Sequence, residues 1–369
     1  MSDSAIRIEP APERPPGPLP EDLGFGRIFT ARMFTQRYTP EAGWHDAVIG
    51  PYRPLQMDPA ALPFHCGQMV FDGTKAYARA DGDVNLFRVE RNAERFNRSA
   101  ERLAMPPVDV ALHVAAIERL VALEGAWVPR QPGSALYIRP VMIATDASLL
   151  VRASRGYLHY IVLSPVSPYF AGGFRPVSVS ISNQHVRAAR GGTGEAKTPA
   201  NYAVSLYPTE QAIAQGYDQV LWLDAAERRY VEEAGAMNIA FVYEGRHIRT
   251  PALSGSILHG ITRDSILRLA PSWGSRRAKT ALTCGRCCAR RRPRRDHRSV
   301  QHGYRRGAGA GRTPRLSGAG LPGERRSARA CCATTLSGAH RYPVRARSDP
   351  YGWTRVVSLH APILSEALG

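Results

Sequence analysis

One segment, residues 275–347, limits how much of this 369-residue chain can form a hydrophobic core. It holds 20 Lys and Arg against 2 Asp and Glu, and it contains five of the six cysteines. The rest of the chain holds 29 basic and 29 acidic residues, so the formal charge of +18 comes from this segment. A stretch so basic and so poor in apolar residues cannot bury a core. We therefore expect the native fold outside it, and we interpret it as an anomalous insert that is not natively folded.

Outside the insert, the chain predicts two domains that each combine strands and helices. Residues 1–22 are rich in proline and acidic residues and lack the parts of a signal peptide, so we expect a disordered leader on a cytoplasmic protein. A small N-terminal domain over 23–166, a linker over 167–175 and a large C-terminal domain over 176–369 follow. No apolar run is long enough to span a bilayer. The fold class is α/β, in an α+β two-domain arrangement.

Hydrophobic periodicity gives the clearest elements. Residues 109–123 repeat apolar side chains at helical spacing, and residues 86–103 also show a helical pattern, with Arg91 and Arg95 on one face. Residues 24–34 alternate apolar and polar side chains, which predicts a strand. The other main predictions are strands over 134–143, 157–166 and 220–224, a helix over 201–215 that Pro208 should kink, and a glycine turn leading into a helix over 255–269.

A glycine-rich loop with a single lysine lies at residues 191–203. It reads Gly-Gly-Thr-Gly-Glu-Ala-Lys-Thr-Pro-Ala-Asn-Tyr-Ala, so that Tyr202 follows Lys197 by five residues. Glycine permits backbone conformations that side chains forbid, which predicts a shaped loop. A lysine amine held in a formed pocket can lose its proton and attack a carbonyl, as in a Schiff base with pyridoxal phosphate. Taken alone, such a loop is more often a solvated surface turn.

A second motif, at residues 233–238, changes this interpretation. It reads Glu-Ala-Gly-Ala-Met-Asn, and with the lysine loop it resembles the branched-chain amino acid aminotransferases, which belong to fold type IV of the pyridoxal phosphate enzymes. The resemblance extends from about residue 25 to 269 and returns in the Asp-Pro-Tyr-Gly-Trp of residues 349–353. It implies a homodimer with the cofactor between the domains of each chain. It also implies transfer of the amino group of leucine, isoleucine or valine to 2-oxoglutarate.

The resemblance implies a role for three residues around the reacting part of the cofactor. Lys197 would form the Schiff base and then move the proton between the substrate Cα and the cofactor. Glu233, which has the family spacing that its neighbour Glu232 lacks, would keep the pyridine nitrogen protonated. Tyr202 would hydrogen-bond the phenolic oxygen of the cofactor. Without the resemblance, these would be a surface lysine, a solvated glutamate and a core tyrosine.

Two further motifs resemble the phosphate contacts of the family. Arg95 ends the sequence Asn-Ala-Glu-Arg, similar to the family's Asn-Met-x-Arg, and a guanidinium can bind a phosphate through two parallel hydrogen bonds. Ile261 and Thr262 follow Gly260 at the start of a predicted helix, where free backbone amides favour anions. A lone Gly-x-Thr before a helix would be weak evidence.

The substrate pocket is expected around four residues. Phe71 would add an apolar wall, Tyr137 would line the side-chain pocket and Arg139 would lie at the substrate end, in a match to the family's Tyr-x-Arg-Pro. Ala236 lies in the Glu-x-Gly motif. An apolar wall favours leucine, isoleucine and valine, and the cost of desolvation excludes acidic side chains. We assign no metal and no membrane partner.

The sequence departs from the family at several motif positions. Pro199 and Ala200 replace two glycines after the lysine, and we expect them to distort the loop, because proline loses an amide and alanine resists positive φ. Cys66 replaces a tyrosine, Asp72 replaces the glutamate of Phe-Glu-Gly, and Ala236 replaces a threonine.

The insert itself lacks a Gly-Thr-Ala turn that the family should carry there. Read one base later with permitted synonymous codons, residues 300–316 give Phe-Ser-Thr-Gly-Thr-Ala-Ala-Val-Leu-Ala-Pro-Val-Gly-Arg-Leu, which is family-like. Near Tyr342 the same shift gives Gly-Ile-Gln-Tyr-Gly. Our hypothesis is that residues 275–347 are translated out of frame.

Two alternatives remain at this point. One is another fold type IV enzyme, a D-amino-acid aminotransferase or an aminodeoxychorismate lyase. The other is an inactive, frame-damaged homologue that binds nucleic acid adventitiously through its basic segment. Within that segment Cys284, Cys287 and His297 are conceivable zinc ligands, but their spacing does not make a tetrahedral site.

Overall fold

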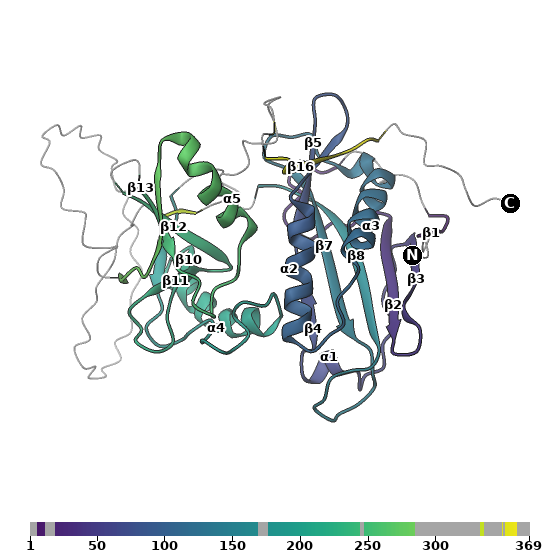
Figure 1. The fold of residues 1–369 in the computed structure, drawn as a ribbon, viewed down its shortest axis with the longest axis horizontal. Coiled ribbons are helices and arrows are strands. Elements are labelled where there is room, and N and C mark those ends of the chain that lie inside the picture. The colour runs from purple at the N-terminus through teal and green to yellow at the C-terminus, as the bar shows by residue number, and fades with distance from the viewer. Residues whose placement is uncertain are drawn as a thin grey trace, which may run out of the picture.

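The structure is a computed structural model that describes residues 6–11, 19–168, 176–243, 247–284, 333–335, 349 and 351–359. These residues form two β-sheets that lie side by side, with helix α2 along the boundary between them (Figure 1). The boundary predicted at 167–175 falls largely on residues 169–175, which lie outside the described ones. Among the described residues, no helix combines the length and the apolar character needed to cross a bilayer.

The first sheet has nine strands in the order β1-β3-β2-β8-β7-β5-β6-β16, with β4 also paired to β7. Its centre is the long antiparallel pair β7–β8, which runs in register from Ala135 opposite Val166 to Ala144 opposite Tyr157. The strands are β1 (Arg7–Ile8), β2 (Arg32–Thr39), β3 (Gly43–Pro51), β4 (Met69–Phe71), β5 (Thr74–Ala78), β6 (Val84–Phe87), β7 (Ala135–Ala144), β8 (Tyr157–Val166) and β16 (Thr354–Val357).

Helices α2 (Val89–Arg102) and α3 (Val110–Leu123) pack against this sheet. Asp109 caps α3, because its carboxylate accepts a hydrogen bond from the Leu112 amide at 2.7 Å. The buried face of α2 contains apolar side chains and also the polar residues Asn92, Arg95 and Ser99. The helix therefore carries both core contacts and a polar stripe. The other helical elements here are the short α1 (Leu62–His65) and the 3-10 turn η1 (Gly125–Trp127).

The second sheet has seven strands in the order β14-β13-β12-β11-β10-β9, with β15 paired to β12. Its strands are β9 (Val179–Ile181), β10 (Gln219–Leu223), β11 (Val231–Ala234), β12 (Met237–Tyr243), β13 (His247–Pro251), β14 (Arg276–Thr280) and β15 (Ala333–Thr335). The helices α4 (Ala200–Ala214) and α5 (Ile261–Leu269) accompany it, and the 3-10 turn η2 (Ala270–Trp273) follows α5. A tight hairpin joins β11 to β12 and pairs Ala234 with Met237 across Gly235, whose φ is 54°.

Several sequence predictions shift in position. The strand expected over 24–34 begins only at Arg32, because Gly24 and Gly26 both adopt positive φ in a turn. The helix expected over 86–103 begins at Val89, because residues 84–87 pair with β5 and β16 instead. The predicted strands over 134–143 and 157–166 and the helix over 109–123 are confirmed within two residues.

The domain assignment of the C-terminal segment needs a correction. We assigned residues 176–369 to one domain, but β16 pairs antiparallel with β6 of the first sheet. Arg355 of this strand forms ion pairs with Glu90 and Glu118. The carbonyl of the preceding Trp353 accepts the Arg88 amide at 2.7 Å, and its ring lies under the Arg88 guanidinium. The chain therefore returns to its first sheet after the insert.

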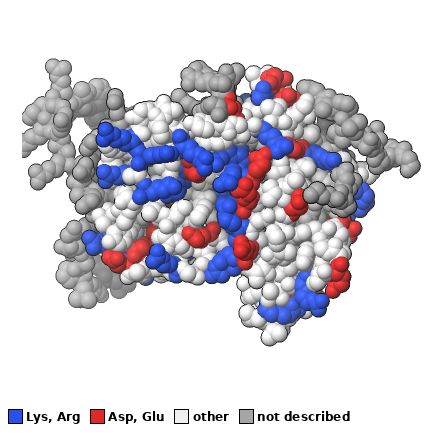
Figure 2. Space-filling model, in the orientation of Figure 1, with Lys and Arg blue, Asp and Glu red and all other residues white. Residues whose placement is uncertain are grey.

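Part of the insert is ordered, against our expectation. β14 pairs in parallel with β13, and β15 pairs with β12, because backbone hydrogen bonds depend little on side-chain identity. The rest of the segment, residues 285–332 and 336–347, lies outside the described ones. Arg276, Arg277 and Lys279 of β14 are exposed, and Figure 2 shows Lys and Arg gathered on the half of the molecule that holds this sheet.

Candidate active site

The backbone of the lysine loop is tied to the first sheet and to α2. The Lys197 amide donates to Ser99 Oγ at 2.9 Å, and the Lys197 carbonyl accepts the Phe71 amide at 3.0 Å. The Thr198 hydroxyl donates to the Met69 carbonyl at 2.9 Å. These bonds fix the Lys197 backbone between the two sheets.

Asn201 closes the loop on itself. Its Nδ2 donates to the carbonyls of Thr193 and Ala196, both at 2.7 Å, and its Oδ1 accepts from the Thr193 hydroxyl at 2.8 Å. A Cβ at Gly194 would overlap the backbone of Ser256, so the loop needs glycine there. The loop is thus shaped, as its glycines predicted.

The distortion that we expected from Pro199 and Ala200 is absent. Pro199 is the N-cap of α4, with φ −51° and ψ −33°, and Ala200 is the first helical residue. Neither position needs positive φ, and a missing amide costs little at a helix start, where the amides have no helical partner. The Pro199 carbonyl accepts the amides of Tyr202 and Ala203 at 2.9 and 2.8 Å.

The Lys197 amine lies among aromatic rings. Its Nζ donates to the Tyr202 hydroxyl at 2.9 Å and lies 5.2 Å from the centre of the Phe71 ring. The rings of Phe71 and Tyr202 are 5.0 Å apart. Arg139, which we placed at the substrate end, donates from Nε and Nη2 to the Tyr137 hydroxyl at 3.0 and 2.8 Å and lies over Phe71. One continuous cluster therefore holds Lys197 and four predicted site residues.

A buried ion pair lies next to this cluster. Arg95 donates from Nε and Nη2 to the two carboxylate oxygens of Asp72 at 2.8 and 2.7 Å, and Asn92 adds a third bond at 2.9 Å. Burial alone would raise the pKa of Asp72, but Arg95, Lys197 and Asn92 together hold it below its usual value. Asp72 therefore stays ionised and fixes the guanidinium of Arg95.

Arg95 also reaches the start of α5. Its Nη1 donates to the His259 carbonyl at 3.4 Å, one residue before Gly260. Gly260 is the N-cap of α5 and caps no amide with a side chain, so the first amides of the helix, at Ile261 and Thr262, are available to an anion. The three residues predicted to bind phosphate thus lie at one place.

Glu233 lies at the other end of the site. Strand register places it opposite Asn238, whose Nδ2 donates to Glu233 Oε1 at 2.7 Å. Burial raises the pKa of Glu233, and Arg187 and Lys197 oppose this rise. The neighbouring Glu232 bonds to the Ser256 hydroxyl instead. A small pocket opens beside Glu233, and its lining consists of Arg187, Asn201, Tyr202, Ser205, Glu233, Gly235, Ala236 and Leu258.

Sequence reasoning missed several residues that support the site. Ser99 and Asn92 share the buried face of α2 with Arg95 at helical spacing, so that spacing was a usable signal. Asp72 was noted only as a departure from the family. Arg187 had no signal, because it lies between β9 and the lysine loop without a recognisable motif. Of the conceivable zinc ligands, Cys284 is described, and Cys287 and His297 lie outside the described residues.

Comparison with known proteins decides the family. Residues 69–288 match the family described as Amino-transferase class IV. The chain is a class IV aminotransferase. The branched-chain-amino-acid transaminase 1 of Bacillus subtilis is 53% identical over 258 residues, which are 70% of this chain and 72% of that protein. A probable branched-chain-amino-acid aminotransferase of Streptomyces coelicolor is 50% identical over 252 residues, 68% of this chain and 69% of that protein. The aminotransferase thus belongs to the branched-chain group.

Solved structures agree with the fold of the aminotransferase. The branched-chain aminotransferase of Thermoproteus uzoniensis has a TM-score of 0.60 at 22% identity, covering 70% of this chain and 81% of that one. A T.th. branched-chain amino acid aminotransferase, solved with pyridoxamine 5'-phosphate, has a TM-score of 0.58 at 25% identity, covering 71% of this chain and 80% of that one. The fold is type IV, and pyridoxal phosphate is the cofactor of this family.

The described residues of the aminotransferase fit that cofactor. Arg95 and the uncapped start of α5 offer a guanidinium and free amides for a phosphate. Glu233 offers a buried carboxylate at the opposite end for a ring nitrogen, and the Lys197 amine lies close enough to lower the pKa of both Asp72 and Glu233. A Cβ at Gly260 would overlap the side-chain amide oxygen of Asn238, so a larger residue there would displace Asn238, which donates to Glu233.

Proposed function

We propose that this aminotransferase transfers the amino group of leucine, isoleucine or valine to 2-oxoglutarate. The observation that carries the proposal is the place of Lys197. Its amine is 2.9 Å from the Tyr202 hydroxyl and lies between the Asp72–Arg95 pair and Glu233. Relatives named as branched-chain aminotransferases are identical at about half of the aligned positions, which cover about 70% of this chain and of theirs.

The residues divide the work as follows. Pyridoxal phosphate, when bound, withdraws electrons from the substrate Cα and so acidifies its proton. The Lys197 amine would take that proton from the substrate Cα and deliver it to the cofactor, and Tyr202 would orient the amine through their hydrogen bond. Arg95, Ile261 and Thr262 hold the phosphate in place.

The substrate side chain meets an apolar wall. Phe71 and Tyr202 present their rings beside Lys197, and Tyr137 is fixed by Arg139. Branched aliphatic side chains therefore suit this wall. The Tyr137 hydroxyl is neutral, so Arg139 keeps its positive charge at this end of the site.

Covalent labelling tests this assignment directly. The full chain is mixed with pyridoxal phosphate, reduced with borohydride and mapped by mass spectrometry, with Lys197→Ala and the exposed-site variant Lys279→Ala in parallel. We expect one phosphopyridoxyl group on Lys197, lost in Lys197→Ala and kept in Lys279→Ala. Labelling of Lys75 or Lys279 at the level of Lys197 would refute the assignment.

A substrate panel tests the specificity. We expect turnover of leucine, isoleucine and valine with 2-oxoglutarate at rates well above those of D-alanine or aspartate. Preference for D-alanine, or release of pyruvate from aminodeoxychorismate, would identify one of the other fold type IV activities.

We also propose a cytoplasmic homodimer, as the family resemblance implies, and light scattering of the purified chain would measure its mass. The out-of-frame origin of residues 275–347 stays a proposal of its own. Sequencing the gene decides it: a coding sequence with no gained or lost base near the two ends of this segment would contradict it.

A further inference from the structure

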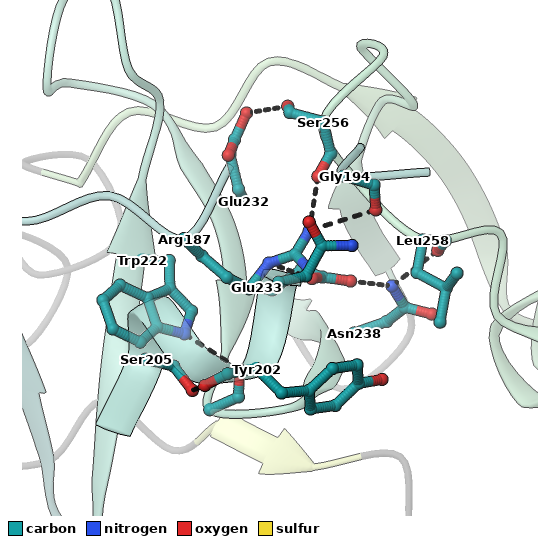
Figure 3. Close-up of polar contacts among 12 residues, drawn as sticks. Arg187, Gly194, Tyr202, Ser205, Trp222, Glu232, Glu233, Asn238, Ser256 and Leu258 are labelled. Atoms are coloured by element: carbon teal, nitrogen blue, oxygen red, sulfur yellow. Dashed lines mark hydrogen bonds and ion pairs between the residues drawn. The ribbon is translucent and has the colours of Figure 1, made fainter. Parts of the chain in front are cut away.

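Arg187 is a buried arginine that joins three parts of the site. It lies between β9 and the lysine loop and is 8% exposed. Its Nη2 donates to the Ser256 carbonyl, which precedes α5, and to the Gly194 carbonyl of the lysine loop at 3.4 Å. Its Nε lies 2.7 Å from Glu233 Oε2, as an ionic contact whose N–H is not aligned with the oxygen. Figure 3 shows Glu233 between Arg187 and Asn238.

Both oxygens of Glu233 are therefore held from opposite sides. Arg187 faces Oε2, and Asn238 donates to Oε1 at 2.7 Å. Asn238 cannot turn its amide freely, because the same Nδ2 also donates to the Leu258 carbonyl at 3.0 Å. A carboxylate held at both oxygens has one orientation, and the pocket beside Glu233 is lined by Arg187 as well.

The charged groups around Glu233 shift its pKa in different directions. Lys197 and Arg187 lower its pKa, and Glu232 raises it. The negative charge of Glu233 in turn favours the charged form of Arg263. Burial acts most strongly and favours the neutral acid. Of the cations, only Arg187 forms an ion pair with Glu233 within the described residues, and Lys197 is needed for the chemistry itself.

We propose that Arg187 is a positioning residue that keeps Glu233 ionised and aimed into the pocket, and so keeps the proton on the ring nitrogen of the bound cofactor. The proposal rests on the proposed function, because it needs the cofactor in this pocket. If Arg187 loses its charge, Glu233 becomes the stronger base and takes the proton from the ring nitrogen. The same guanidinium also holds the lysine loop and the segment before α5 at a fixed distance from Glu233.

The chain offers a matched control for the test. Arg190 lies in the same connection, and its Nε donates to the Ser254 carbonyl at 3.0 Å, but it is exposed and forms no ion pair in the described part of the chain. Arg190→Gln therefore removes a loop anchor without touching Glu233. Arg187→Gln removes an anchor and a charge, and Arg187→Lys keeps the charge with a different geometry.

The first measurement is the pH midpoint of the visible absorbance of the lysine-linked cofactor, in the full chain. We expect Arg187→Gln to move the midpoint upward by about one to three pH units, because an unprotonated ring withdraws fewer electrons. Arg187→Lys should recover most of that shift, and Arg190→Gln should show none. In a Glu233→Gln background, Arg187→Gln should cause no further shift. Equal midpoints in Arg187→Gln and Arg190→Gln, or a full shift that persists without Glu233, would overturn the proposal.

The second measurement uses the full chain without cofactor and separates this proposal from the proposed function. Stability is followed against pH for Arg187→Gln and for Arg187→Gln/Glu233→Gln. The double variant removes both partners of the ion pair and keeps the comparison open if the single variant folds poorly. We expect the stability of the single variant to fall with rising pH relative to that of the double variant. The pH range of this fall should extend to higher pH than in the unmodified protein. Parallel curves would overturn the proposal even if labelling of Lys197 succeeds. Absence of labelling together with diverging curves would refute the proposed function and keep the Arg187–Glu233 linkage.

Discussion

At the phosphate end of the site, the carboxylate of Asp72 receives two hydrogen bonds from Arg95, whereas at the ring end the carboxylate of Glu233 faces one nitrogen of Arg187. The two ion pairs also differ in which partner is expected to contact the cofactor. At the phosphate end it is the cation, Arg95, and at the ring end it is the anion, Glu233. The pKa of Asp72 is lowered and that of Glu233 is raised, since burial outweighs a single ionic contact but not a paired one. A firmly charged guanidinium suits a phosphate, and the carboxylate of Glu233 depends on the one ionic contact from Arg187 to oppose the effect of its burial.

We expect the largest effect from a substitution that breaks the Asp72–Arg95 ion pair at the phosphate end. Asp72→Asn leaves the buried Arg95 without its counter-charge, which should cost about 3–5 kcal/mol of stability. Urea denaturation measures this loss, and affinity for pyridoxal phosphate should fall in parallel. The control is Asp81→Asn, which breaks the exposed Arg79–Asp81 pair and should change stability far less, because water screens that pair. Equal losses in the two variants would show that Asp72 does not anchor Arg95.

Asp72 and Glu233 should change the stability of the protein with pH in opposite directions. Asp72 has a lowered pKa, so its contribution is present above its unfolded value of 3.8 and is lost as the pH falls through the folded value. Glu233 has a raised pKa, so stability falls as the pH rises from 4.5 through its folded value, by at most about 1.4 kcal/mol per pH unit. Glu233→Gln should remove that decline in thermal unfolding from about pH 5 upward. A decline that remains unchanged in Glu233→Gln would contradict the raised pKa.

A smaller effect tests the link between the two ends. The Ser99 hydroxyl accepts the Lys197 amide and donates to the Arg95 carbonyl. Ser99→Ala removes both bonds and should cost about 1 kcal/mol of stability, with a lower rate of Lys197 labelling. Ser148→Ala, which removes a bond on an exposed turn, is the matched control. If labelling is unchanged while stability falls, Ser99 supports the fold but not the lysine.

The smallest effect concerns the altered loop. Pro199→Gly restores a family residue but frees the unfolded chain, so we expect it to cost about 0.4–1 kcal/mol of stability. Cofactor affinity should stay the same, because Pro199 already has helical φ and ψ. Equilibrium dialysis checks this expectation. A large gain in affinity would mean that proline does distort the loop.

The sequence pointed to the residues that we expect to contact the cofactor, but it missed several residues that hold them in place. Short motifs around Lys197 and Glu233 carry a spacing that the chemistry needs, and the Lys197 amine lies in one cluster with Tyr202, Phe71, Tyr137 and Arg139. Asp72 and Arg187 act through partners that are distant in the sequence, and no periodicity records such a contact. The helix over 109–123 was predictable from its apolar repeat, whereas the place of β16 depends on pairing with β6 across most of the chain.

The return of β16 to the first sheet also determines what that sheet presents to other molecules. With β16 in place, the polar backbone groups of β6 on that side are paired. A chain whose translation ends within residues 285–348 would keep every predicted site residue and still uncover this strand. An uncovered edge is a template for pairing with another chain, so such a product would self-associate through β6 and be lost to aggregation.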